Sequence, residues 1–169
     1  RHAAEVAAAV LPRLDSARLL IVQGDTSSAL GAAMAASSAQ IGIAHVEAGL
    51  RSHDRKRPWP EEEFRAEIDR RAQLLFTPTE LSAANLRRER SGGCIHVTGN
   101  SGIDAVLALR AGRQAPPAGS QPKLLVTCHR RESWGLGLAG IAGALRTIAD
   151  EEIASVELLL HPNPATAAY

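Results

Sequence analysis

Short apolar runs alternate with segments of helical periodicity along the whole chain. The runs predict strands at residues 18–23, 41–47, 74–79, 94–99, 123–129 and 155–161. The remaining segments, whose apolar residues recur at the period of a helix, predict helices at residues 1–14, 26–38, 61–72, 80–90, 101–110 and 136–152. Such regular alternation is typical of an α/β fold with a parallel sheet and flanking helices.

Hydroxyl side chains mark three of the predicted helix starts. Thr26, Thr79 and Ser101 can each accept a hydrogen bond from a backbone N–H that has no partner inside its helix. We therefore expect these three residues to be N-caps. Asn100, in the "GNS" sequence, is interpreted as part of the same turn and cap rather than as a ligand.

One stretch interrupts the alternation. Residues 112–122, "GRQAPPAGSQP", have the Gly, Pro and polar composition of a linker. We expect an N-terminal domain at residues 1–113, a linker at residues 114–122 and the beginning of a C-terminal domain at residues 123–169. The chain also begins within a helical pattern and ends soon after a strand, and we expect it to be a fragment.

The composition fits a globular protein and disfavours several classes of partner. The 169 residues are 45% hydrophobic, which allows a sizeable core. Lys and Arg number 19 against 18 for Asp and Glu, so no large positive field would attract nucleic acid or an anionic membrane. No apolar stretch approaches the roughly 18 residues of a membrane span, and the first residues do not resemble a signal segment.

The two cysteines give no sign of a disulfide framework or a zinc site. Cys94 and Cys128 are far apart and match no metal-ligand spacing. A reducing cytoplasm is therefore the expected location, and no metal is expected.

Polar residues gather in the loops that follow the predicted strands. The densest stretch is "HVEAGLRSHDRKRPWPEEEFR", residues 45–65. In an open parallel sheet, ligands bind beyond the carboxyl ends of the strands, because the loops converge there. We therefore expect the chemistry of this protein at that edge.

Asp25 and Glu47 are the first candidate residues at this edge. Asp25 could instead cap the helix at residues 26–38 or offset its dipole, and from its position alone such a structural role is the more common one. An ionised Glu47 at the end of an apolar strand needs a partner, and Arg51 is the obvious one. For Glu47 and Arg51, a structural ion pair that holds the loop and a catalytic role are equally compatible with the sequence.

Glu61, Glu62 and Glu63 open the helix predicted at residues 61–72. Carboxylates in a first turn offset the helix dipole, so their presence needs no functional explanation. Glu61 differs from its neighbours because the preceding Pro-Trp-Pro sequence stiffens the approach to it.

The histidines lie in different settings. We expect His45 to pack or hydrogen-bond within its strand and His53 to face solvent, and we assign neither a role. His129 stands with Arg130 and Arg131 at the end of a strand and before a helix, where an imidazole and two guanidiniums suit the anionic oxygens of a diphosphate. A solvated basic loop is the alternative.

Gly135, Gly137 and Gly140 formally match the dinucleotide-binding pattern G-x-G-x-x-G. The first of these glycines lies seven residues past Cys128, whereas the pattern requires it at the end of the strand. We therefore expect no nicotinamide cofactor.

Six blocks of sequence together resemble the UDP-N-acetylglucosamine 2-epimerases. They are "QGDTSSAL", "HVEAGLRS", "PWPEE", "FTPTELSAANL", "VTGNSGIDA" and "VTCHRRESWG". Each block alone is a weak signal, but all of them occur in the family's order and at matching spacing over nearly the whole chain. The combination is therefore specific.

The resemblance implies two Rossmann-like domains in a glycosyltransferase-B arrangement, with a nucleotide sugar between them and no cofactor. Such enzymes interconvert UDP-N-acetylglucosamine and UDP-N-acetylmannosamine. They remove the proton at C2 with anti elimination of UDP, which gives 2-acetamidoglucal, and add UDP back after protonation of the other face. The family usually serves bacterial surface polysaccharide synthesis. The expected full-length protein is a cytoplasmic homodimer with no nucleic-acid or membrane partner.

The resemblance also assigns site residues. Asp25, Glu47 and Glu61 match the family's essential carboxylates, and His129 matches its essential histidine. The residues expected to bind substrate are Arg51, Arg130 and Arg131. Abstracting a carbon-bound proton requires a base and returning one to the opposite face requires an acid, so carboxyl groups must converge. His129 would stabilise the departing diphosphate. The base and the acid are not assigned individually.

Some features depart from the family pattern. Phe64 and Cys128 stand where Asn and Gly are common. By the resemblance, the family's first strand with its Gly-Thr-Arg-Pro phosphate loop would lie before Arg1 and the segments that hold uridine would lie after Tyr169, so we expect this sequence to be the middle of the enzyme. We expect the isolated chain to be poorly active or inactive. A hydrolysing epimerase and a UDP-sugar glycosyltransferase of the same fold are the alternatives.

Overall fold

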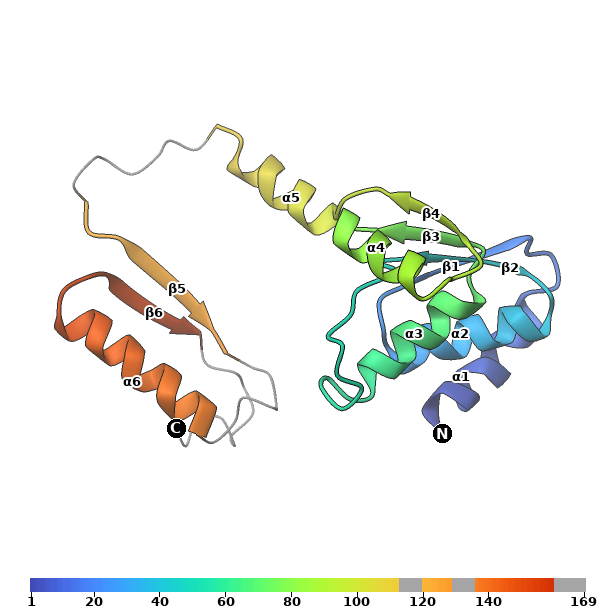
Figure 1. Ribbon diagram of the computed structural model, residues 1–169, viewed down its shortest axis with the longest axis horizontal. Helices are drawn as coiled ribbons and strands as arrows, with labels where there is room; N and C mark the ends of the chain where they lie inside the picture. Colours follow the sequence, from blue (N-terminus) through green and yellow to red (C-terminus); the bar gives the residue numbers. More distant parts are fainter. Residues whose placement is uncertain (113–119, 129–135, 160–169) are drawn as a thin grey trace. The chain divides into compact units, whose positions relative to one another are not determined.

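The computed structural model describes residues 1–112, 120–128 and 136–159 (Figure 1). The chain divides into two compact units, Arg1–Ala111 and Gly112–Tyr169. Among the described residues, no helix has both the length and the apolarity needed to cross a bilayer.

The first unit contains a parallel sheet with strand order β1-β2-β3-β4. Its strands are β1 Leu19–Gln23, β2 Gly42–Val46, β3 Leu74–Thr77 and β4 Cys94–Val97. Its helices are α1 His2–Val10, the 3-10 helix η1 Leu11–Arg13, α2 Ser27–Ser38, α3 Glu61–Arg71, α4 Glu80–Arg88 and α5 Ser101–Arg110. The predicted α/β fold with a parallel sheet and flanking helices is confirmed.

The second unit contains a parallel pair of strands, β5 Lys123–Thr127 and β6 Ser155–Leu159, and the helix α6 Leu136–Asp150. This strand-helix-strand order is the one that the apolar pattern predicts. The Rossmann-like identity of the two domains stays a prediction.

Helices pack on the sheet of the first unit and enclose its core. Figure 1 shows α1, α2 and α3 below the sheet, and α4 contacts β3 and β4. Ile43, Ile68, Leu75 and Leu86 come from four different elements and are each at most 1% exposed. Burying side chains of this size contributes roughly 1.5–3 kcal/mol each, so the core holds the sheet edge in a defined geometry.

The expected helix at residues 1–14 is too long. The α-helix ends at Val10 and a 3-10 turn follows, so Leu14 lies beyond it. Pro12 explains the change, because it has no N–H to continue the α-helical hydrogen bonds and its ring clashes with the preceding turn.

Two of the three expected N-caps are confirmed. Thr26 and Thr79 accept hydrogen bonds from the N–H groups of Ala29 and Ser82, each over 3.1 Å. Ser101 is not a cap, because Asn100 accepts from the Gly102 N–H at 2.8 Å and Ser101 is already helical. Asn100 therefore has the capping role that the sequence favoured over ligand binding.

Candidate active site

The carboxyl ends of β1 and β2 bring Asp25 and Glu47 to one edge of the sheet. Gln23 and Val46 are opposite each other in register, and the Gly24 N–H donates to the Val46 carbonyl oxygen over 3.1 Å. Glu47 Oε2 lies 3.7 Å from the position that a Cβ on Gly24 would take. The Glu47 carboxylate is therefore close to the turn that leads into Asp25.

A guanidinium from α3 holds Asp25. Arg65 forms an ion pair with Asp25 through Nη2, and its Nη1 lies 3.2 Å from Glu62 Oε2. Since Arg65 stands about one helical turn after Glu61, the start of α3 lies against the turn that carries Asp25. The alternative that Asp25 caps α2 is wrong, because the capping atom is Thr26 Oγ1.

Glu61 and Glu62 are neighbours with different environments. Glu62 is 5% exposed and accepts from the Ser52 N–H at 3.0 and 3.1 Å and from the His53 N–H at 3.2 Å. Glu61 Oε2 is buried and has no hydrogen-bond partner within the described ranges. Glu62 therefore anchors the loop before α3, whereas Glu61 keeps an acceptor oxygen available.

Arg51 does not form the expected ion pair with Glu47. Its Nη1 lies 2.8 Å from Asp69 Oδ2, while its Nε and Nη2 donate to the two oxygens of Glu89 at 2.7 and 2.6 Å. Burial by itself lowers the pKa of the Arg51 guanidinium. The hydrogen bond to Glu89 and the attraction of Asp69 outweigh that effect and raise the pKa. The role of Arg51 in substrate binding stays a prediction.

His45 is hydrogen-bonded, but not within its own strand. Its Nδ1 lies 2.6 Å from Asp69 Oδ1 on α3, and its Nε2 lies 2.9 Å from the Gly24 carbonyl oxygen beyond β1. The fold buries His45 completely between these two elements. His53 is exposed, as expected.

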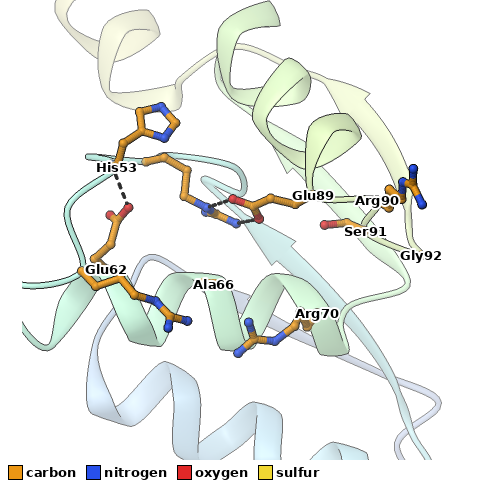
Figure 2. Close-up of a pocket in the computed structure, with 10 residues that line it drawn as sticks. His53, Glu62, Ala66, Arg70, Glu89, Arg90, Ser91 and Gly92 are labelled. Atoms are coloured by element: carbon orange, nitrogen blue, oxygen red, sulfur yellow. Dashed lines mark hydrogen bonds and ion pairs between the residues drawn. The ribbon is translucent and has the colours of Figure 1, made fainter.

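A cavity of about 600 Å³ lies beside these residues in the first unit. Figure 2 shows Glu62 reaching from α3 toward His53. The guanidinium of Arg51 donates to Glu89. The lining residues are Arg51, His53, Arg55, Glu62, Ala66, Arg70, Glu89, Arg90, Ser91 and Gly92. None of the three predicted catalytic carboxylates is among them, whereas Arg51, an expected substrate-binding residue, is.

Three of the expected site residues cannot be compared with the structure. His129, Arg130 and Arg131 lie outside the described residues, and so does Gly135. In the described part of the chain, no group of three or more His, Cys, Asp or Glu side chains is arranged to hold a metal ion.

Sequence reasoning did not single out Glu62, which binds the loop before α3, Arg65, which pairs with Asp25, or Asp69, which contacts His45, Gly49 and Arg51. A usable signal was present. Positions 61, 65 and 69 recur at intervals of four in a predicted helix, so their side chains lie on one helix face.

Known proteins resemble this chain in sequence and in fold. A family model described as UDP-N-acetylglucosamine 2-epimerase matches residues 6–169. The chain is 40% identical over 145 residues to the UDP-N-acetylglucosamine 2-epimerase of Escherichia coli (strain K12), covering 78% of this chain and 39% of that protein. It is 36% identical over 173 residues to the enzyme of that name from Bacillus subtilis (strain 168), covering 95% and 46%.

The structural likeness is of similar extent. The crystal structure of UDP-GlcNAc 2-epimerase from Neisseria meningitidis bound to UDP-GlcNAc matches with a TM-score of 0.81 and 31% identity. The match covers 97% of this chain and 48% of that one. The chain therefore spans less than half the length of each of these relatives.

Proposed function

This chain belongs to the UDP-N-acetylglucosamine 2-epimerase family, and we propose that the complete protein interconverts UDP-N-acetylglucosamine and UDP-N-acetylmannosamine. We further propose that it acts in the cytoplasm as a homodimer. Within it, residues 1–113 would form most of an N-terminal Rossmann-like domain, residues 114–122 a linker and residues 123–169 the start of a C-terminal one.

The placement of Asp25 and Glu47 at one sheet edge carries the proposal. Glu47 lies over the Gly24 turn, and Arg65 links the start of α3 to Asp25. The buried Oε2 of Glu61 lacks a hydrogen-bond partner within the described residues. An epimerase needs such an arrangement, because C2 must lose a proton on one face and regain one on the other.

The reaction assigns a task to each group. One of Asp25, Glu47 and Glu61 would take the C2 proton as the bond from C1 to the UDP oxygen breaks, and another would return a proton to the opposite face. The C1 bond to UDP would then form again. His129, with Arg130 and Arg131, would stabilise the negative charge on the departing diphosphate, and Arg51 would contribute to substrate binding.

The test uses the complete protein that carries this sequence, supplied with UDP-N-acetylglucosamine in deuterium oxide. We expect UDP-N-acetylmannosamine with deuterium at C2. Glu61→Gln should lower kcat by at least about 100-fold, because the amide can neither accept nor return the proton. Glu63→Gln is the matched control in the same helical turn. Glu63 is exposed and should tolerate the change with little loss.

Other products would overturn the assignment. Free N-acetylmannosamine with UDP would indicate a hydrolysing epimerase. Transfer of the sugar to an acceptor with C2 unchanged would indicate a glycosyltransferase of the same fold. If Glu61→Gln and Glu63→Gln had equal activity, the role of Glu61 would be wrong.

A further inference from the structure

Asp69 lies at the centre of a buried hydrogen-bond network outside the proposed set of catalytic residues. Its side chain is fully buried on α3, two helical turns after Glu61. The carboxylate meets His45 Nδ1 at 2.6 Å, the Gly49 N–H at 3.2 Å and Arg51 Nη1 at 2.8 Å. A buried carboxylate is costly unless it is paired in this way, so all three contacts hold it in one position.

Two of these contacts flank Glu47. His45 stands two residues before Glu47 and Gly49 stands two residues after it, and Asp69 binds both through different oxygens. Glu47 itself has a φ of +68°, a conformation that is unfavourable for a residue with a Cβ. A backbone held on both sides can keep this conformation, and the conformation sets the direction of the Glu47 side chain.

His45 extends the network to Asp25. Its Nε2 lies 2.9 Å from the carbonyl oxygen of Gly24, the residue directly before Asp25. A carbonyl oxygen only accepts hydrogen bonds, so Nε2 is the donor. The ring therefore links the Asp69 carboxylate to the turn that carries Asp25.

Arg51 closes the network on its outer side. It contacts Asp69 and binds both oxygens of Glu89. Its guanidinium balances the buried negative charge of Asp69, which allows the carboxylate to remain an acceptor for the Gly49 N–H.

We propose that Asp69 is a positioning residue of the epimerisation site, whose carboxylate holds the two strand-end turns that orient Asp25 and Glu47. This inference rests on the proposed function, because it gives Asp69 a task only if those two carboxylates act on the substrate. Asp69 itself does not touch the reacting atoms. It acts through Gly49 on one side and through His45 on the other.

The experiment compares Asp69→Asn with Gln73→Ala in the complete protein. Asparagine keeps the size of Asp69 but places an amide N–H₂ where one acceptor oxygen was, against either His45 or Gly49 and Arg51. Gln73→Ala is the control, because Gln73 Oε1 accepts from the Ile43 N–H at 2.7 Å and so supports β2 at its other end. The readouts are kcat, KM and amide hydrogen exchange of peptides that contain Gly49 or Ile43.

We expect Asp69→Asn to lower kcat by about 10- to 100-fold with KM changed by less than about threefold, because misplaced catalytic groups slow the chemical step more than they weaken binding. Exchange should accelerate in the peptide that contains Gly49. Gln73→Ala should accelerate exchange at Ile43 and leave kcat within about twofold. If Asp69→Asn and Gln73→Ala lowered kcat equally, general destabilisation would explain both losses, and the inference would be overturned.

A second variant keeps the test decisive if Asp69→Asn does not fold. His45→Asn places an amide donor near the position of Nδ1, which keeps the contact with Asp69 and removes the one with Gly24. It should lower kcat while amide hydrogen exchange at Gly49 stays unchanged, and unaltered kcat would overturn the link to Asp25.

If the unchanged protein does not epimerise its substrate, the proposed function fails. Exchange at Gly49 in the folded Asp69 variant then decides whether the carboxylate holds that turn.

Discussion

Replacing Gly49 with Ala tests how closely the loop after β2 approaches α4. Gly49 has a φ of +79°, and a Cβ there would stand 2.3 Å from the carbonyl oxygen of Ser82 and 2.9 Å from its carbonyl carbon. These are backbone atoms of α4, so the contact cannot be relieved by a side-chain rotation. The left-handed conformation costs about 1 kcal/mol for Ala and the overpacking about 1–3 kcal/mol. Gly49→Ala should therefore lower the free energy of unfolding by about 2–4 kcal/mol.

Gly99→Ala is the matched control. Gly99 has a φ of +81°, but no atom lies within 4 Å of the position of its Cβ. Gly99→Ala should therefore lower the free energy of unfolding only by the conformational cost, about 1 kcal/mol. Native-state hydrogen exchange of peptides from β2 and β3 measures the opening of the first unit separately from the second. If both variants lose the same free energy, the close approach of Gly49 to α4 is refuted.

Two further changes test local contacts. Thr26→Ala should cost about 1 kcal/mol in urea unfolding, whereas Thr26→Ser keeps the capping oxygen and should cost clearly less; equal losses would contradict the cap. The hydrogen bond from Arg70, assisted by Arg71, outweighs desolvation and lowers the pKa of Glu67 below its usual 4.5. This stabilisation is present above that value and is lost as pH falls through the folded pKa, so the Tm difference between the unchanged protein and Glu67→Gln should shrink in acid. A difference that is constant from neutral pH to about pH 3 would exclude this linkage.

Local patterns predicted most of the elements, and they failed mainly at element ends. β3 ends at Thr77 rather than at residue 79, because Pro78 has no N–H to donate and Thr79 turns to cap α4. The first α-helix ends at Val10 for a related reason, the presence of Pro12. Alternation and helical periodicity are properties of neighbouring residues, and so they need no tertiary information.

The partners of the charged groups could not be predicted in the same way. Arg51 is the cation nearest to Glu47 along this loop, yet it pairs with Asp69 and Glu89. The ion-pair partner of Asp25 is Arg65, which is 40 positions away along the chain. The spacing of positions 61, 65 and 69 puts their side chains on one helix face, but it does not show that Arg65 meets Asp25 or that Asp69 meets Arg51.

The sequence by itself determined the strands and helices, the family and the sheet edge at which Asp25 and Glu47 lie. The carboxyl ends of parallel strands lie at one edge of a sheet whatever the details of packing. The common edge of Asp25 and Glu47 therefore follows from the predicted strands alone. Only the tertiary structure decided which charged groups pair, such as Arg65 with Asp25 and Arg51 with Asp69. A buried charge must be paired, and the partner is whichever opposite charge the packing of distant elements brings within reach.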